Sequence, residues 1–352
     1  MALETLQDIE NCMNSGWTDG LPVIPPYGSV VNEMLDAMGW RADDVSGEFP
    51  EHNVIVRAEQ AAATAVMAGC AMEYGSLLRS LTEALLDPKL NICGVEVTTG
   101  GASLMVIVSG PVVSQLGFEH GANALGANCR ANATVGRFAQ MMRLFCGRAG
   151  GVLQPHGTIG HPGRISFCVA EHPETEWGAY HTQMGIPEDA SAVSVMSTEG
   201  PNSCNNHYGD TAAQILDTIG DCMCHYGQTA WYYRSGGFVV VIAPDHMALV
   251  SKEFSRDEAR AYIYEHARRQ TDDLERMGRI AKEPIAFAEV EPGAMRSPLR
   301  SADQLTFIEC GAAGGRFSAV IPRWVGSTHI MTKQINEKAS PSSRETAEGN
   351  PK

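Results

Sequence analysis

Three segments of the chain place apolar residues at helical spacing. In EYGSLLRSLTEALLD (73–87), leucines recur on one helical face until a proline stops the pattern. The segments DTAAQILDTIGDCMCHYG (210–227) and SRDEARAYIYEHARRQ (255–270) have the same period. We expect Asp210 and Ser255 to cap these two helices, because their side chains can accept hydrogen bonds from the first free N–H groups.

Other segments are continuously apolar, which predicts strands buried on both faces. They are LMVIVSGPVVSQL (104–116) and FVVVIAPDHMALV (238–250), and each runs through a proline, Pro111 or Pro244, into the start of a helix. The two segments therefore echo one another. A weaker echo links the upstream strands predicted at VEVTTGG and VSVMSTEG, and LTFIEC (305–310) predicts a last strand.

Strands of this kind belong to parallel or mixed sheets that helices cover. The pattern therefore predicts an α/β fold with two quasi-repeated halves, residues 51–195 and residues 196–334. The Pro-Pro pair near the start predicts an extended N-terminal arm at 1–50. Residues 335–352 are polar and carry Pro, Ser and Gly, which predicts a disordered tail.

Composition and charge narrow the class of protein. The 352 residues are 44% hydrophobic and 19% charged, as in a globular protein. The net charge of −15 disfavours nucleic acid, although local arginines can still bind a small anionic substrate. No apolar run approaches the roughly 20 residues of a membrane helix, so we expect no membrane partner. The start of the chain is acidic and lacks the features of a signal peptide, which predicts a cytoplasmic protein.

The ten cysteines are scattered through a long chain, unlike those of a disulfide-stapled domain. Cys70 follows Gly69, where one helical pattern stops and another begins. A helix N-terminus would lower the pKa of its thiol and favour the nucleophilic thiolate, with Glu73 as a proton acceptor. The alternative is that Cys70 is a small buried residue at a helix junction.

The segment GANALGANCRANATVGRF (121–138) is rich in glycine and asparagine and carries two arginines. Free N–H groups at a helix start, together with a guanidinium, suit a carboxylate or another anion. The alternative is an ordinary loop with left-handed asparagines. With the threonines that end VEVTTGG, the predicted substrate-binding residues are Thr98, Thr99, Asn123, Arg130, Asn132 and Arg137.

Histidines and a cysteine in two polar loops suggest either acid–base chemistry or a metal. Cys204 and His207 have metal-ligand spacing, but no second such pair accompanies them. His207 and His161 are also candidates for the general acid or base. The possible ligands of a divalent metal are His156, His161, Cys204, His207 and His246. No nicotinamide or flavin fingerprint is present, and no other cofactor is predicted.

A set of motifs resembles a largely uncharacterised bacterial protein family, loosely associated with small UGSC-motif (seleno)proteins. The motifs, spread over most of residues 15–330, are WTDGLPVIPP, AVMAGCAMEY, GVEVTTGG, GANALGANCRANATVGR, GHPGRISFCVAE, EGPNSCNNH and GGRFSAVIPRW. The resemblance implies thiol chemistry but no defined activity. The family pattern has no cysteine at the position of Cys204, which weakens the metal pair. The matching positions are Asp19, Cys70, Glu73, Asn123, Arg130, Asn132, Arg137, His161 and His207.

These observations predict a lyase or hydrolase that cleaves a carbon–heteroatom bond in a small anionic organic substrate. Its catalytic residues would be Cys70, Glu73, His161 and His207, with Cys70 as the nucleophile. A metal-dependent lyase or hydrolase is one alternative. A non-enzymatic redox or scaffold subunit for a small thiol protein is another. The extended arm favours a homodimer, because such arms wrap neighbouring subunits.

Overall fold

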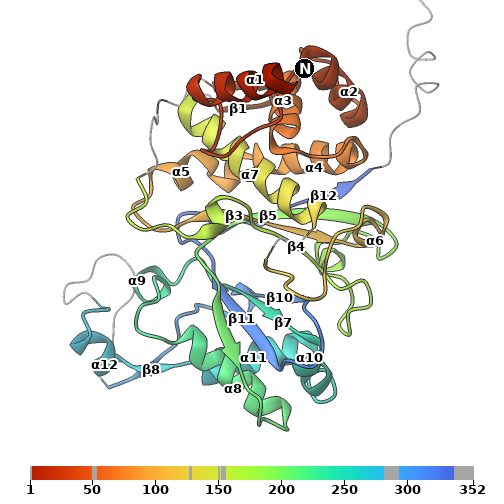
Figure 1. The fold of residues 1–352 in the computed structure, drawn as a ribbon. Coiled ribbons are helices and arrows are strands. Elements are labelled where there is room, and N and C mark those ends of the chain that lie inside the picture. The colour runs from red at the N-terminus through yellow and green to blue at the C-terminus, as the bar shows by residue number, and fades with distance from the viewer. Residues whose placement is uncertain are drawn as a thin grey trace, which may run out of the picture.

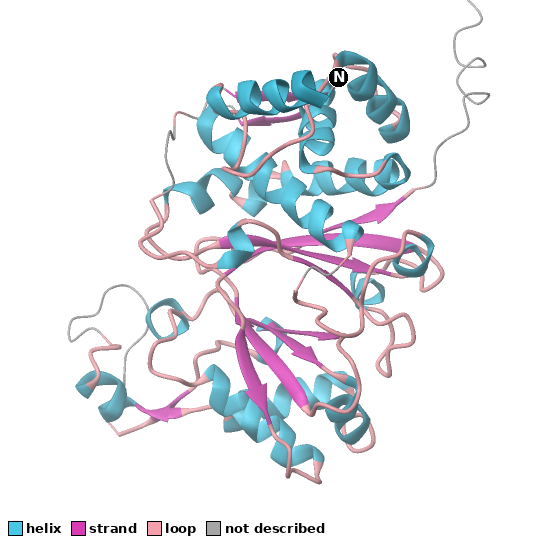
Figure 2. Cartoon of the chain, in the orientation of Figure 1, coloured by secondary structure: helices cyan, strands magenta, loops and turns pink. Residues whose placement is uncertain are grey.

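The computed structural model of the protein describes residues 2–49, 54–126, 129–149, 151, 156–280 and 293–336. Two four-stranded sheets pack face to face, and helices cover the outer face of each sheet (Figure 1, Figure 2). Both sheets mix parallel and antiparallel pairs, so the predicted α/β fold is confirmed. From residue 337 onward, the predicted tail lies outside the described residues.

The first sheet has the strand order β12-β5-β3-β4. Its central strand β3 runs parallel to β4 and antiparallel to β5, and β5 runs antiparallel to β12. The strands are β3 (Ser103–Ser109), β4 (Cys168–Ala170), β5 (Ser191–Thr198) and β12 (Met331–Ile335).

The second sheet has the order β10-β7-β11-β6 and repeats this scheme. Strand β7 runs parallel to β10 and antiparallel to β11, which runs antiparallel to β6. Strand β7 thus takes the place of β3, and β10 takes that of β4. The strands are β6 (Asn202–Asn205), β7 (Phe238–Ile242), β10 (Leu305–Glu309) and β11 (Phe317–Pro322).

The two sheets exchange their outermost antiparallel strands. Strand β6 directly follows β5 in the chain, but it pairs with β11 of the second sheet. Strand β12 directly follows β11, but it pairs with β5 of the first sheet. The boundary predicted between residues 195 and 196 falls inside β5, and the division into two halves stays a prediction.

Helices form the two outer layers (Figure 1). The first sheet is covered by α4 (Gly75–Leu85) and α7 (Arg130–Ala149), and α2 (Gly28–Met38) and α3 (Ala58–Ala68) pack on these two helices as a second layer. The second is covered by α8 (Ala212–Met223), α10 (Pro244–Val250) and α11 (Arg256–His266). In the described part of the chain, none of the helices combines the length and apolar character needed to cross a membrane.

Shorter elements connect these layers. The remaining helices are α1 (Ala2–Asn14), α5 (Ile92–Val97), α6 (Val112–Gln115), α9 (Ala230–Tyr233) and α12 (Thr271–Arg276). Two small hairpin sheets pair β1 (Val45–Phe49) with β2 (Val54–Arg57), and β8 (Arg269–Gln270) with β9 (Met295–Arg296).

The continuously apolar strands are buried on both faces, as their pattern predicts. In β3, Leu104 and Val106 pack against the helices, whereas Met105 and Ile107 pack against the second sheet. Successive side chains of a strand point to opposite faces, so a strand between two apolar layers needs an apolar residue at every position. The core between the sheets is therefore built from alternate residues of both sheets.

Local details confirm some sequence predictions and correct others. Ser255 caps α11 as predicted, but the cap of α8 is Thr211 and not Asp210. The strand predicted at VEVTTGG is wrong, because its first three residues lie in α5 and the rest form a loop. The side chain of Asn91 accepts a hydrogen bond from Gly94 N there and starts a helix that the β-branched residues alone would not favour.

Candidate functional site

Cys70 lies in a different setting from the one predicted. Its N–H donates to Ala65 O over 3.1 Å, so it closes the C-terminal turn of α3 and does not begin the next helix. The side chain is 5% exposed, and its Sγ donates to Thr134 O at 3.4 Å. Burial raises the pKa of this thiol to about 12, despite nearby arginines. The predicted lowering of the Cys70 pKa is therefore wrong, because desolvation outweighs those charges.

The two predicted arginines beside Cys70 hold pieces of the chain together. Arg130 Nε donates to Gly69 O at 3.1 Å, which fixes the start of α7 against the end of α3. Arg137 grips Asp19 of the N-terminal arm through two hydrogen bonds of 2.7 and 2.8 Å, and its Nη2 also donates to Pro22 O. Arg137 uses most of its donors in these contacts, which leaves little for a substrate. The contact to Gly69 O uses only the Nε of Arg130, whose side chain is exposed.

Asn123 belongs to the loop that precedes α7, and Asn132 lies in the first turn of that helix. Asn132 is 1% exposed and exchanges hydrogen bonds with both backbone groups of Glu119, so it anchors this loop. Asn123 has the left-handed backbone expected there, with a φ of 57°. Residues 127–128 of the same predicted segment lie outside the described residues. Glu73 is exposed, and no contact joins it to Cys70.

The predicted metal ligands do not converge. Cys204 points from β6 into the core beneath α8, whereas His207 is exposed and stacks edge-on against Phe317. His161 lies elsewhere, at the start of β3, and His156 is exposed. Within the described ranges, no three or more His, Cys, Asp or Glu side chains gather closely enough to hold a metal ion.

A polar cavity of about 460 Å³ brings two predicted residues, Thr99 and His161, together with Glu199 and Asn202. It forms where loops from the first half meet the connection between β5 and β6. Thr99 and Thr158 are joined through a backbone hydrogen bond of 2.9 Å. We call this the Glu199 cavity.

The ring of His161 is held on both nitrogens. Its Nδ1 accepts a hydrogen bond from Gly163 N at 3.2 Å, and its Nε2 lies 3.0 Å from Ser103 Oγ. Because Nδ1 accepts, the proton resides on Nε2. Burial lowers the pKa of His161, which keeps the imidazole neutral. His161 therefore forms the wall of the cavity and positions its neighbours, and its nitrogens are not free for acid–base catalysis.

Glu199 is the titratable side chain of this cavity that the sequence analysis missed. It directly follows β5, and it is partly buried. Burial raises the pKa of its carboxyl above the usual value, although a hydrogen bond from Thr229 opposes the shift. A carboxyl with a raised pKa is a stronger base once ionised. The sequence shows that Glu199 lies at the end of a predicted strand, and that position could have marked it as a candidate. Its contact with Thr229 could not be predicted, because the two residues are distant in sequence.

Beneath the Glu199 cavity lies a group of buried charges. The side chain of Arg164 runs under Gly160, where an added Cβ would lie 3.2 Å from Arg164 Cδ. Arg164 and Arg143 both pair with the single carboxylate of Glu96. Two positive charges and one negative charge leave this group with a net charge of +1. Its field favours an anion in the cavity above.

A second cavity, of about 470 Å³, shares Pro201 with the first. Its walls include Asn123, Cys310 and the aromatic ring of Phe317, beyond which His207 stacks. The carboxylate of nearby Asp245 accepts backbone N–H bonds from the glycine loop at Gly314 to Arg316, which fixes that loop. Burial raises the pKa of Cys310 far above its usual range, so this thiol is not nucleophilic.

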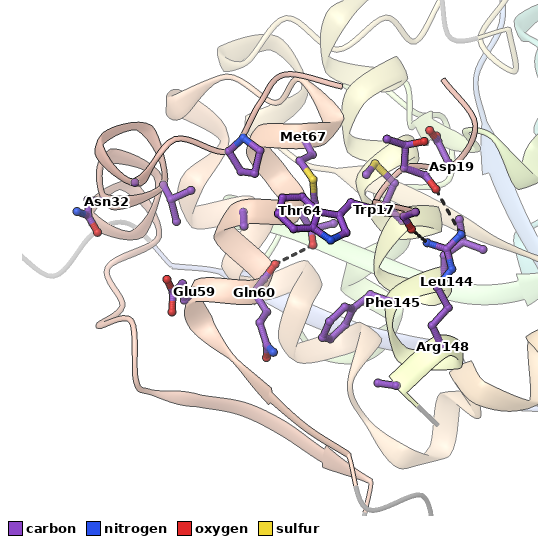
Figure 3. Close-up of a pocket in the computed structure, with 18 residues that line it drawn as sticks. Trp17, Asp19, Asn32, Glu59, Gln60, Thr64, Met67, Leu144, Phe145 and Arg148 are labelled. Carbon is purple, nitrogen blue, oxygen red and sulfur yellow. Dashed lines mark hydrogen bonds between the residues drawn. The ribbon is translucent and has the colours of Figure 1, made fainter. Parts of the chain in front are cut away.

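A third and larger cavity, of about 940 Å³, lies between the N-terminal arm and α3 and α7. Figure 3 shows Met67, Trp17 and Phe145 in its middle, with Glu59 and Arg148 on opposite sides. Arg148 donates to the backbone carbonyls of Gly16 and Thr18. This arm cavity is mostly apolar, and two of its polar residues, Asp19 and Arg148, form bonds that hold the arm. It therefore suits binding better than chemistry.

Comparison with known proteins adds no family. No protein-family model matches the chain, and no curated protein is significantly similar to it. The resemblance to the UGSC-associated family therefore rests on the motifs alone and stays a prediction.

Proposed function

We propose that the protein is an enzyme of the lyase or hydrolase type, in which Glu199 is the general base. It would cleave a carbon–heteroatom bond in a small carboxylate bound in the Glu199 cavity. The observation that carries the proposal is a partly buried carboxyl in a polar cavity, directly above a buried group of net positive charge. That combination offers both a base and a site for an anion.

The residues divide the work as follows. The field of Arg164 and its partners attracts the substrate carboxylate, and Thr99, Thr158 and Asn202 offer polar groups around it. Ionised Glu199 removes a proton from the carbon next to that carboxylate. The electron pair left behind forms a double bond, and the heteroatom group leaves from the neighbouring carbon. In the hydrolytic version, Glu199 removes a proton from the attacking water.

The test is turnover of a panel of small carboxylic acids with a hydroxyl, amine or thioether on the second carbon from the acid. Elimination produces an unsaturated acid that is followed by ultraviolet absorbance. Replacing the base with Glu199→Gln should lower kcat by roughly 100-fold or more, since general base catalysis contributes on that scale. Thr229→Val should move the acid limb of the pH profile upward, because the hydrogen bond from Thr229 lowers the Glu199 pKa.

Two further variants separate this proposal from its rivals. Cys70→Ala should retain turnover, whereas a covalent mechanism through Cys70 requires its loss. Ala63→Trp, which fills the arm cavity, should also leave turnover unchanged. Full activity of Glu199→Gln would contradict the proposal. No turnover across the panel, with stable co-purification of a small thiol protein, would favour the scaffold alternative instead.

A further inference from the structure

Two cysteines from different elements meet at the edge of the second sheet. Cys204 faces the helix layer from β6, opposite Ser318 of β11, and it is 2% exposed. Cys222 comes from the last turn of α8 and packs against the same core. Its Sγ donates to Ser203 O at 3.8 Å, so it lies beside the residue that precedes Cys204 in β6. Each thiol is the largest influence on the pKa of the other.

Solvent reaches the pair at Cys222. Strand β6 is the edge strand of its sheet, and Cys222 is partly exposed beside it. Cys224, two positions further along, is 1% exposed and points into the core. Cys222 therefore presents the accessible sulfur, and Cys204 is the buried sulfur directly behind it.

We propose that Cys204 and Cys222 form a redox-active dithiol that hydrogen peroxide converts to a reversible disulfide. This site is separate from the Glu199 cavity and does not depend on the proposed function. In the structure all ten cysteines are free thiols, so it represents the reduced form.

The chemistry balances with peroxide as the only oxidant. The Cys222 thiolate attacks one peroxide oxygen, the O–O bond breaks, and hydroxide leaves to become water. The sulfenic acid formed on Cys222 is then attacked by the sulfur of Cys204. The S–S bond forms as the second water leaves, so two thiols and one peroxide give one disulfide and two waters.

The electrostatics favour Cys222 as the first sulfur to react. The hydrogen bond from Cys204 lowers the pKa of the Cys222 thiol, and it outweighs both burial and the nearby charge of Asp221. The same contact, together with burial, raises the pKa of Cys204. A partly exposed thiolate with a protonated thiol beside it is the arrangement found in reactive cysteine pairs.

Peptide mapping of the full chain tests the proposal. Reduced protein is treated with hydrogen peroxide, the remaining thiols are blocked with N-ethylmaleimide, and the digest is analysed without reduction. The expected result is one cross-linked peptide pair joining Cys204 to Cys222, which dithiothreitol separates. Over-oxidised Cys222 without the cross-link would overturn the proposal, as would a disulfide from Cys222 to another cysteine.

Variants provide an independent readout and a matched control. Cys204→Ala should slow alkylation of Cys222 by roughly tenfold at neutral pH, because each unit of pKa changes the thiolate fraction by that factor. Cys222→Ser should abolish the cross-link. Cys224→Ser, from the same helix end, should form it as the unmodified protein does. An unchanged alkylation rate in Cys204→Ala would show that the two thiols do not interact and would overturn the proposal.

Discussion

Strands β4 and β10 occupy the same edge position in the two sheets, yet helices hold them in different ways. Helix α7 lies so close to the β4 segment that Gly136 has no room for a side chain: an added Cβ would be 2.4 Å from Ser166 Oγ and 2.8 Å from Phe167 N. Helix α11 stays further from β10 and reaches it with a side chain, because Arg260 Nε donates to Leu305 O at 2.9 Å. The two sheets thus share the same strand order, but the contacts between the edge strand and its covering helix differ.

A glutamate stands at the end of each of these strands, but its position relative to the strand end is shifted by one residue. Glu309 ends β10 on the same face as Phe307, which packs in the helix layer. Glu171 follows β4 on the same face as Val169, which packs between the sheets. A shift of one residue along a strand reverses the face, so two glutamates at matching strand ends have different surroundings.

Breaking the close approach of α7 to β4 should have the largest effect. Gly136→Ala forces a methyl group against backbone atoms that cannot move aside, so we expect a loss of about 3 kcal/mol in the free energy of unfolding. Urea denaturation measures it. The control is Gly220→Ala in α8, whose Cβ would have Ala267 Cβ as its nearest neighbour, at 3.3 Å. There the better helix propensity of alanine should offset the tight contact, within about 1 kcal/mol. Equal losses would contradict the comparison.

The sequence predicted the elements better than it predicted their neighbours. The apolar runs of β3 and β7 and the cap at Ser255 depend on local pattern, and local pattern was sufficient. The exchange of β6 and β12 was not predictable, because the sequence of a short strand does not determine which sheet it pairs with. The sequence left open whether Cys70 is a reactive thiol or a small buried residue, and the structure shows it buried. The sequence could not decide because residues from distant segments, such as Thr134, set its exposure.

The two strand-end glutamates should respond differently to pH. Burial raises the pKa of Glu171 to about 8, whereas 4.5 is the ordinary value. The folded state therefore binds this proton more tightly, and its stabilising effect is complete below about pH 4.5 and lost as the pH rises to about 8. Between about pH 5 and about pH 7, the unmodified protein should lose about 2 kcal/mol more stability than Glu171→Gln. Unfolding free energies at both pH values measure this difference.

Glu309→Gln is the matched variant for this experiment. Burial also raises the pKa of Glu309, but its carboxyl accepts hydrogen bonds from the Glu176 N–H and the Thr175 side chain, which oppose the shift. Removing it should therefore change the pH dependence less than Glu171→Gln does. The reverse order would show that the faces assigned to the two glutamates are wrong.

Arg260→Met tests the side-chain contact that replaces close packing at β10, and it should have the smallest effect. The variant loses the hydrogen bonds to Leu305 O and to Gln183 Oε1 but keeps the apolar stem of the side chain. We therefore expect the free energy of unfolding, measured by urea denaturation, to fall by about 1 kcal/mol. Arg276→Met is the control. Arg276 forms the same ion pair with an aspartate three residues earlier as Arg260 does, but it is far more exposed.

Arg276→Met should lower the free energy of unfolding by less than about 0.5 kcal/mol, because an exposed ion pair of this kind contributes little. Any larger effect of Arg260→Met then belongs to its contacts with the strand and the loop, and not to its ion pair with Asp257. If both variants lose the same amount, Arg260 does not hold β10. The helix layer would then be fixed to the two edge strands by apolar packing alone, and the difference between the two halves would lie only in Gly136.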